Sequence, residues 1–178
     1  MKELNKWLYS YDLNYSSFLN GYIDEILRLY QKPIKEGDGH DFYIDIKPIT
    51  NFIIPKLNKI VEDNFYVGKK YEDDGLRVYV QEGSNEKHAS TLHNHAHRAG
   101  NMCGIFYLNI PTEGGEFHVL NPPYLDEFIK IEINKVYLFP IWLMHRAMPH
   151  KDNIKRICFN WVYGGNIRPI NKYTGNLW

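Results

Sequence analysis

The feature that most constrains the fold of this chain is a series of short apolar segments that runs from Phe42 to Gly164. Val, Ile, Tyr and Phe dominate these segments, and Gly, Pro, Asn or Asp separates each from the next. β-Branched and aromatic residues favour strands, and short strands that recur roughly every ten residues are typical of a β-sandwich or barrel. The predicted strands are residues 42–47, 76–82, 89–95, 102–110, 115–120, 128–133, 135–140 and 156–164.

Two amphipathic helices are predicted in the first third of the chain. Apolar residues recur every three or four positions across residues 18–30, which places them on one helical stripe. A weaker pattern covers residues 51–63, and we expect Pro55 in the first turn of that helix, where a missing N–H removes no hydrogen bond. Its inward-facing residues are Ile53, Leu57, Ile60 and Val61. The pattern as a whole predicts helices packed on a double-sheeted β core.

Charge and cysteine content narrow the functional classes. Lys plus Arg and Asp plus Glu number 21 each, and this balance argues against strong non-specific attraction to nucleic acid. Cys103 and Cys158 form neither a CxxC pair nor a disulfide framework. The N-terminus lacks the apolar region of a signal peptide, and the longest apolar run, residues 137–144, is too short to cross a bilayer. We therefore expect a soluble protein of the cytoplasm.

Three histidines stand at alternate positions in the segment TLHNHAHRAG. In an extended segment His93, His95 and His97 point to the same side, because successive side chains alternate. A fourth histidine, His145, lies 48 residues beyond His97 between two strand-like segments. Neutral imidazole suits Fe, Zn, Cu and Ni, so the cluster and His145 are candidate ligands of one metal ion. The remaining histidines, among them His118 and His150, are expected to be solvated.

A possible anion clamp follows His145 by eleven residues. Arg156 begins the segment RICFNW, and in a strand it shares one face with Cys158 and Asn160. The opposite face is apolar and must belong to the core. An arginine inside a barrel is costly unless it meets a carboxylate, which a guanidinium binds through two parallel hydrogen bonds. The same region therefore offers a metal ligand and a carboxylate-binding residue.

These residues together resemble the Fe(II)/2-oxoglutarate-dependent oxygenases. That superfamily shows a His-x-Asp/Glu or His-x-His pair, then a third His about fifty residues on, and an Arg roughly ten residues later. The segments HRAGNMCGIFYLNIP and YLFPIWLMHRAMPHKDNIKRICFNW resemble a small bacterial and phage branch of the superfamily. The turn GGEF is similar to one in prolyl-hydroxylase-like members. The similarity spans residues 90–163.

The resemblance implies iron ligands. Matching by length favours His95, His97 and His145, with His93 as the alternative to His97. Two residues of slack in the loop would select the pair His93 and His95 instead. Most of the superfamily has a carboxylate as second ligand, whereas both pairs here end in His. Three neutral imidazoles leave Fe(II) its full double charge, which a dianionic cosubstrate would neutralise, and three His ligands also occur in some catalytic zinc sites.

The resemblance also implies a cosubstrate site. Arg156 would hold the distal carboxylate of 2-oxoglutarate, and Tyr107 would donate a hydrogen bond to it. Cys158, which stands where a Ser is usual, and Asn160 lie on the same strand face. Trp142 is a weaker candidate for lining the substrate channel, since core packing also explains it.

The implied fold is a double-stranded β-helix, a jelly-roll or cupin-like barrel, formed by one domain. Residues 1–65 would be a helical N-terminal support, residues 75–163 the β core with the metal site, and residues 164–178 a surface tail. The implied activity is that of a dioxygenase that uses Fe(II), 2-oxoglutarate and O2, with hydroxylation of a peptide side chain or small molecule as its expected reaction.

Two other classes remain open. A cupin-like metalloprotein would not need 2-oxoglutarate, and it would leave Arg156 without a task. Cupins place a Glu four or five residues after the His pair, where this chain has Gly100, Asn101 or Met102. A jelly-roll binding module without catalytic activity is the second alternative. Tight binding of 2-oxoglutarate that is lost on Arg156→Ala would separate the oxygenase from both.

Overall fold

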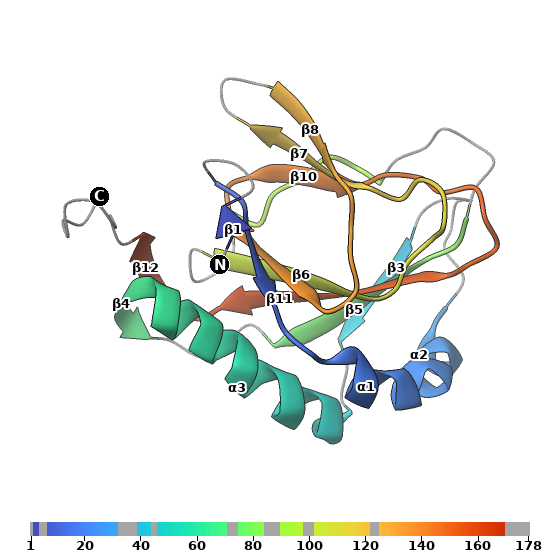
Figure 1. The fold of residues 1–178 in the computed structure, drawn as a ribbon, viewed down its shortest axis with the longest axis horizontal. Helices are drawn as coiled ribbons and strands as arrows, with labels where there is room; N and C mark the ends of the chain where they lie inside the picture. The colour runs from blue at the N-terminus through green and yellow to red at the C-terminus, as the bar shows by residue number, and fades with distance from the viewer. Residues whose placement is uncertain are drawn as a thin grey trace.

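The computed structural model describes residues 2–3, 7–31, 39–43, 46–70, 75–83, 90–97, 102–121 and 125–169. Two antiparallel sheets face each other, and the helices cover the outer side of the larger sheet (Figure 1). The major sheet has the order β1 (Lys2–Glu3), β2 (Tyr9–Asp12), β9 (Lys135–Pro140), β6 (Met102–Asn109), β11 (Arg156–Tyr163), β5 (Leu76–Gln81) and β3 (Gly39–Tyr43). The minor sheet has the order β10 (Met144–Ala147), β7 (Phe117–Asn121) and β8 (Leu125–Ile129).

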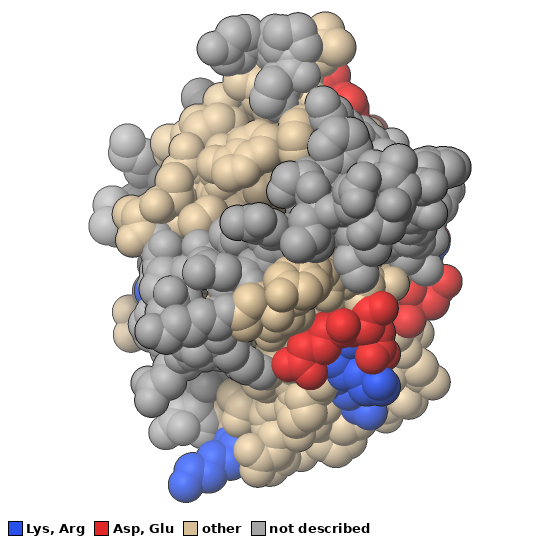
Figure 2. All heavy atoms as spheres, turned by 90° about the vertical axis from the view of Figure 1, so that its left-hand side faces the viewer, with Lys and Arg blue, Asp and Glu red and all other residues tan. Residues whose placement is uncertain are grey.

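The helical layer and a small third sheet complete the described fold. The helices are α1 (Ser16–Leu19), the 3-10 turn η1 (Asn20–Tyr22), α2 (Ile23–Leu29) and α3 (Lys47–Asn64). β4 (Phe65–Lys70) pairs with β12 (Gly165–Pro169). No helix in the described part of the chain has the length and apolarity that crossing a bilayer requires. On the face shown in Figure 2, described acidic and basic side chains lie beside one another, in keeping with the balanced composition.

Strand alternation divides the core into two clusters. On β11, Ile157 and Phe159 face the helices, whereas Cys158 and Val162 face the minor sheet. The helix-side cluster is closed by α3, whose fully buried residues are Ile49, Ile53, Leu57 and Val61. Burial of each of these side chains contributes about 1.5–3 kcal/mol, which explains why a helix with an internal proline is stable here. The second cluster fills the space between the sheets and surrounds the candidate site.

The predicted strands 76–82, 102–110, 115–120, 135–140 and 156–164 correspond to β5, β6, β7, β9 and β11. The segment predicted at 128–133 forms a strand only up to Ile129, because the chain then turns into β9 through Asn134, whose φ is 62°. The prediction of a strand at 89–95 was wrong for residues 90–95, where His93 forms an isolated bridge and no strand is described; residue 89 lies outside the described residues. The strand predicted at 42–47 begins earlier, at Gly39; residues 44–45 lie outside the described residues, and Lys47 already belongs to α3.

Several elements were missed by pattern alone. β2 comes from residues 1–65, which were expected to be a helical support, and it joins the major sheet. β10 is too short to show periodicity. The expectation for Pro55 was also wrong: α3 begins at Lys47, so Pro55 lies inside the helix. It is tolerated because Pro55 and Asn51, whose carbonyl loses its helical donor, are both exposed to solvent.

Candidate metal and cosubstrate site

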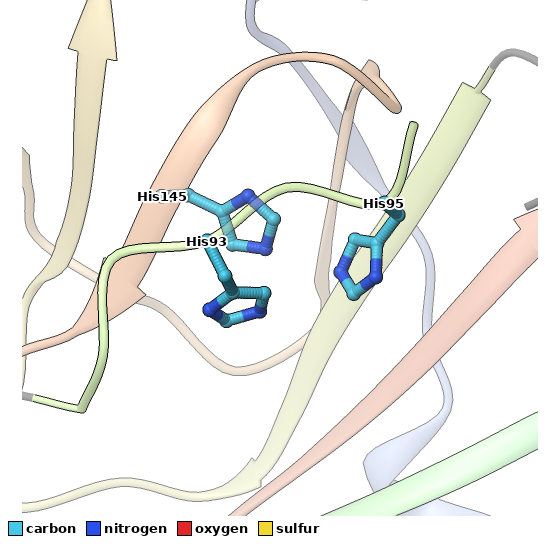
Figure 3. A group of neighbouring side chains, drawn as sticks. All are labelled: His93, His95 and His145. Atoms are coloured by element: carbon cyan, nitrogen blue, oxygen red, sulfur yellow. The ribbon is translucent and has the colours of Figure 1, made fainter. Parts of the chain in front are cut away.

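The site begins with a backbone pairing that joins the histidine segment to β10. The His93 N–H donates to the His145 carbonyl at 3.0 Å, and the His145 N–H donates to the His93 carbonyl at 2.8 Å. Two residues further on, the His95 N–H donates to the carbonyl of Ile141 at 2.7 Å. The register of these bonds determines which histidines face the space between the sheets (Figure 3).

Three imidazoles converge in this space. The ring centroids of His93 and His145 are 4.5 Å apart, and that of His95 lies 5.1 Å from the first and 5.0 Å from the second. One nitrogen from each ring lies within 4.8 Å of the others. His97 is exposed, and its ring centroid is 6.4 Å from that of His95. The structure therefore groups the alternative pair, His93 and His95, with His145, and leaves His97 outside.

Backbone carbonyls orient two of the three rings. Nδ1 of His145 is 2.8 Å from the carbonyl oxygen of Leu143, and Nδ1 of His93 is 2.8 Å from that of Thr91. A carbonyl can only accept, so each Nδ1 carries the proton and each Nε2 keeps its lone pair. Such an outer hydrogen bond holds a metal-binding imidazole in the required tautomer.

His145 is the most buried of the three, with 5% of its surface exposed. Burial, and to a smaller extent the neighbouring His93, lower the pKa of the imidazole from 6.5 to about 3, although the bond to Leu143 opposes the shift. The aromatic rings of Phe117 and Phe139 pack on it at 5.5 and 4.8 Å between centroids. His145 is thus held in the neutral form that a metal ion requires.

The three histidines open into a cavity of about 430 Å³, a size within the range of small-molecule sites. Arg156, Tyr107, Cys158 and Asn160 line the same cavity, so the structure brings together the predicted metal and cosubstrate residues. Trp142 is not among the lining residues. It is 40% exposed and packs edge-on against Trp7, with 5.0 Å between ring centroids.

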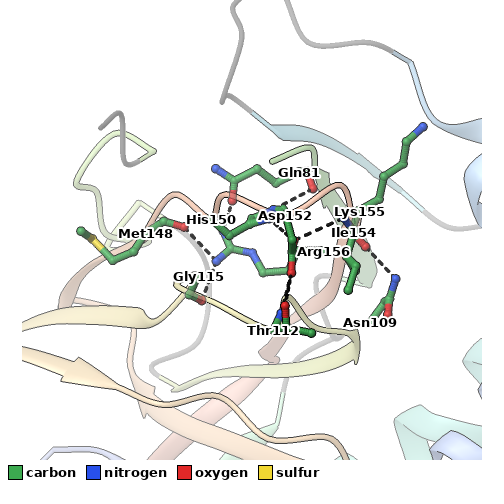
Figure 4. A network of polar contacts seen from close by, with 10 residues as sticks. All are labelled: Gln81, Asn109, Thr112, Gly115, Met148, His150, Asp152, Ile154, Lys155 and Arg156. Atoms are coloured by element: carbon green, nitrogen blue, oxygen red, sulfur yellow. Dashed lines mark hydrogen bonds and ion pairs between the residues drawn. The ribbon is translucent and has the colours of Figure 1, made fainter. Parts of the chain in front are cut away.

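Arg156 is fully buried, with 0% exposure. Its Nη1 donates to the carbonyls of Gly115 at 2.7 Å and Met148 at 3.1 Å, and its Nη2 donates to the side-chain oxygen of Gln81 (Figure 4). Within the described residues its Nε has no hydrogen-bond partner, and no carboxylate pairs with the guanidinium. A buried charge that meets only neutral acceptors is costly, and an anion placed against Nε would remove that cost.

The double-glycine turn brings a carbonyl to Arg156. Gly114 and Gly115 have φ values of +78° and +76°, which other residues rarely adopt. A Cβ on Gly115 would lie 2.4 Å from Cγ of Pro111. Backbone geometry therefore requires the two glycines of the GGEF motif. Their turn places the Gly115 carbonyl where it accepts a hydrogen bond from Nη1 of Arg156.

A second group of polar residues closes this end of the barrel and was not predicted. Nδ1 of His150 is 2.9 Å from Oδ1 of Asp152, and its Nε2 is 3.4 Å from the backbone oxygen of Gln81. Oδ2 of Asp152 accepts from the N–H and hydroxyl of Thr112 at 2.6 and 2.9 Å. The expectation that His150 is solvated was therefore wrong. The sequence offered one sign of this polar group: Gln81 is a polar residue on the same strand face as Arg77 and Tyr79 in LRVYVQ.

His118 was also expected to be solvated and is in fact buried. It lies on the outer face of the minor sheet, where Nε of Arg146 donates to its Nδ1 at 2.8 Å. Its Nε2 is 2.6 Å from Oδ1 of Asp126, and Phe128 stacks on its ring. The side chain is satisfied locally and lies apart from the three-histidine cluster.

Tyr107 lies opposite Cys158 on the neighbouring strand. Burial raises its pKa well above 10, and the nearby Cys158 thiol raises it further, while Arg156 lowers it. The hydroxyl therefore remains protonated and can donate. The backbone of Tyr107 is fixed by Tyr15, whose hydroxyl donates to the Tyr107 carbonyl at 2.8 Å.

No protein-family model matches this sequence, and no curated protein does. Solved structures do match. A prolyl-4-hydroxylase from Pseudomonas putida superposes with a TM-score of 0.66 at 10% identity, covering 88% of this chain and 92% of that one. A Trichoplax adhaerens prolyl hydroxylase, solved with a hypoxia inducible factor peptide fragment, gives a TM-score of 0.67 at 13% identity, covering 90% of this chain and 84% of that one.

A viral collagen prolyl hydroxylase from Paramecium Bursaria Chlorella virus-1, solved as a 2OG complex, gives a TM-score of 0.61 at 16% identity, covering 88% of this chain and 96% of that one. Identities this low establish the fold. The prediction of a mainly β, double-stranded β-helix with N-terminal helices is confirmed. This chain has the fold of the prolyl hydroxylases and other 2OG-Fe(II) oxygenases.

Proposed function

We propose that this chain is an Fe(II)- and 2-oxoglutarate-dependent dioxygenase that hydroxylates a peptide side chain or a small molecule. The observation that carries the proposal is the presence, in one cavity, of three converging imidazoles and a buried arginine without a carboxylate partner among the described residues. A metal site alone explains the histidines. A carboxylate ligand would explain why Arg156 is buried beside them with no partner for its Nε among the described residues.

His93, His95 and His145 would hold the metal. The donor set fits iron, because imidazole nitrogens are common iron ligands and three of them on one side leave the cavity side open. When bound, Fe(II) supplies the oxygen-activating chemistry that couples oxidation of 2-oxoglutarate to succinate and carbon dioxide with hydroxylation of the substrate. The bonds from Nδ1 of His93 and His145 to backbone carbonyls would direct Nε2 of each ring toward the metal, and burial keeps His145 neutral.

Arg156 and Tyr107 would bind the distal carboxylate of 2-oxoglutarate. The Nε of Arg156 has no other partner among the described residues, and the protonated Tyr107 hydroxyl is a second donor in the same wall. Cys158 and Asn160 continue this wall beside the cosubstrate. The Cys158 thiol is a weaker hydrogen-bond donor than the hydroxyl of the usual Ser, so Arg156 would contribute a larger share of the free energy of 2-oxoglutarate binding. Gln81 holds the guanidinium in place.

A reducing compartment such as the cytoplasm fits the proposal. Neither Cys103 nor Cys158 forms a disulfide, and both line the cavity. Disulfides form in oxidising compartments, and free thiols beside a ferrous site are best preserved where the surroundings are reducing.

Anaerobic titration of the Fe(II)-loaded protein with 2-oxoglutarate tests the proposal. A visible metal-to-ligand charge-transfer band should appear and saturate with one equivalent. His145→Ala should abolish the band, and Arg156→Ala should move its appearance to much higher cosubstrate concentrations. Arg28→Ala is the matched control, since Arg28 is exposed on α2. Folded wild-type protein that binds Fe(II) but shows no band would refute the assignment.

A further inference from the structure

We infer that Gln81 makes the Arg156 end of the cavity selective for a cosubstrate with a distal carboxylate. Its side chain is a neutral amide, which holds the guanidinium of Arg156 without compensating its charge. Gln81 is thus a positioning residue that acts through Arg156 and does not itself bind the ligand. The inference rests on the proposed function and specifies which residue sets the charge of the ligand at this end.

Strand register makes Gln81 the direct cross-strand neighbour of Arg156. Arg156 of β11 lies opposite Gln81 of β5, and both side chains are fully buried. Directly opposite residues have Cβ atoms about 4.5–5.5 Å apart, so a carboxylate at this position would be within reach of the guanidinium. The chain has an amide there instead, and the amide oxygen accepts from Nη2 of Arg156 (Figure 4).

The other acceptors of the guanidinium are neutral as well. Nη1 donates to two backbone carbonyls, those of Gly115 at 2.7 Å and Met148 at 3.1 Å, which accounts for both of its hydrogens. Three neutral acceptors fix the orientation of the guanidinium, but none of them supplies a negative charge. Nε has no hydrogen-bond partner in the described part of the chain, so the fixed group keeps an N–H for a ligand.

The carboxylate of the surrounding polar network is bound by other donors. Among the residues drawn in Figure 4, Asp152 is the acidic one. Its Oδ2 accepts from the N–H and the hydroxyl of Thr112 at 2.6 and 2.9 Å. Its Oδ1 lies 2.9 Å from Nδ1 of His150 and 3.3 Å from the backbone nitrogen of Ile154. These contacts occupy both oxygens of Asp152 and leave Arg156 without a share in them.

Glu82, the residue after Gln81, is paired with a different cation. Its Oε1 is 3.3 Å from Nζ of Lys155, and both side chains are partly exposed. Neither Glu82 nor Asp152 therefore compensates Arg156, whose charge remains available to an anion that enters the cavity.

A glutamate in place of Gln81 would reverse this arrangement. Its side chain has the same length, so a carboxylate oxygen would replace the amide oxygen beside Nη2 and form a buried ion pair. A distal carboxylate would then approach a guanidinium whose charge is already compensated, and it would meet a second negative charge beside it. Juxtaposed like charges in a buried site oppose binding strongly. The neutrality of Gln81 is what leaves this end of the cavity open to a carboxylate.

The test compares two 2-oxo acids that differ only at the distal end. 2-Oxoglutarate ends in a carboxylate and 2-oxopentanoate in a methyl group, whereas both present the same 2-oxo acid group to the metal. Binding of each to the anaerobic Fe(II) protein is followed by the charge-transfer band. Wild type should bind 2-oxoglutarate at least about thirtyfold more tightly than 2-oxopentanoate, as expected for one buried charge pair.

Gln81→Glu should reduce this ratio to threefold or less by weakening 2-oxoglutarate alone, with the Kd of 2-oxopentanoate within threefold of wild type. Gln81→Met removes the acceptor without adding charge and should keep a ratio of at least tenfold. Gln31→Glu is the matched control, because it makes the same substitution at an exposed position and should leave both Kd values unchanged. The urea midpoint of ligand-free Gln81→Glu should equal or exceed that of wild type, since the new pair compensates a buried charge.

Three results for Gln81→Glu would overturn the inference and leave the proposed function intact: a ratio that stays above threefold, equal weakening of the two acids, or failure to fold. A ratio below tenfold in Gln81→Met would also do so, because charge would then not be the cause. Equal affinity of wild type for both acids would overturn the inference together with the carboxylate role of Arg156. Wild-type protein that binds Fe(II) but gives no band with either acid would overturn the proposed function itself.

Discussion

Replacement of Arg156 by Met separates the two roles of a buried guanidinium, in folding and in binding. The substitution removes a charge that has no carboxylate partner among the described residues, and it leaves three acceptors, on Gly115, Met148 and Gln81, without their donor. Each lost partner costs about 1–3 kcal/mol, whereas relief of the buried charge returns several kcal/mol. Because the two effects oppose each other, the free energy of unfolding of the ligand-free variant should lie within about 3 kcal/mol of the wild-type value.

Binding of 2-oxoglutarate should respond much more strongly. Loss of one partner of a buried charge pair costs about 2–5 kcal/mol, which corresponds to a roughly 30-fold to several-thousand-fold weaker Kd. The assay is calorimetric titration of the anaerobic Fe(II) protein, combined with urea unfolding with and without cosubstrate. At about 100 times the wild-type Kd, wild type should gain about 2.7 kcal/mol from the ligand, and Arg156→Met should gain less than about 1 kcal/mol at the same concentration. A variant that keeps its Kd within threefold would refute the carboxylate role of Arg156.

Three further predictions follow from the site. His145→Ala should weaken Fe(II) binding at least tenfold, whereas His97→Ala should change it less than threefold. If metal titration showed the same loss of Fe(II) affinity in both variants, the assignment of His93 in place of His97 would be contradicted. In the metal-free protein the pKa of His145 is lowered to about 3, so the folded state binds fewer protons than the unfolded state below pH 6.5. The free energy of unfolding, measured in urea, should therefore fall by about 2 kcal/mol between pH 6.5 and 5. His145→Asn should abolish this fall. Gly115→Ala should lower the free energy of unfolding by about 1–3 kcal/mol or more, because its φ of +76° and the contact with Pro111 both oppose a Cβ; an unchanged Tm would show that the turn relaxes.

The residue pattern of the strands was largely sufficient to predict the β core. Alternation in RICFNW assigned Arg156 and Cys158 to one face and the apolar residues to the other, and the structure has that arrangement. Alternation is a local property of an extended backbone, so a single sequence can show it. The short strands β2, β10 and β12 have too few residues for a period to emerge, and their existence depends on partners supplied by the rest of the sheet.

The choice among the histidines could not be made from spacing. Counting residues favoured His95 and His97, whereas the pairing of His93 with His145 shifts the segment by two residues and excludes His97. A loop can absorb two residues without any change in the residue types at its ends. The register was decided by backbone hydrogen bonds between segments about fifty residues apart, which no local pattern records.

The sequence by itself determined the chemistry available to this protein: imidazoles for a metal, a guanidinium for a carboxylate, and strands with one polar and one apolar face. The tertiary structure decided which groups meet. It placed Gln81, His150 and Asp152 around Arg156 and grouped His93, rather than His97, with His95 and His145. The physical reason is that residue type sets what a side chain can bind, whereas the neighbours of that side chain are set by long-range strand register, which depends on the packing of the whole chain.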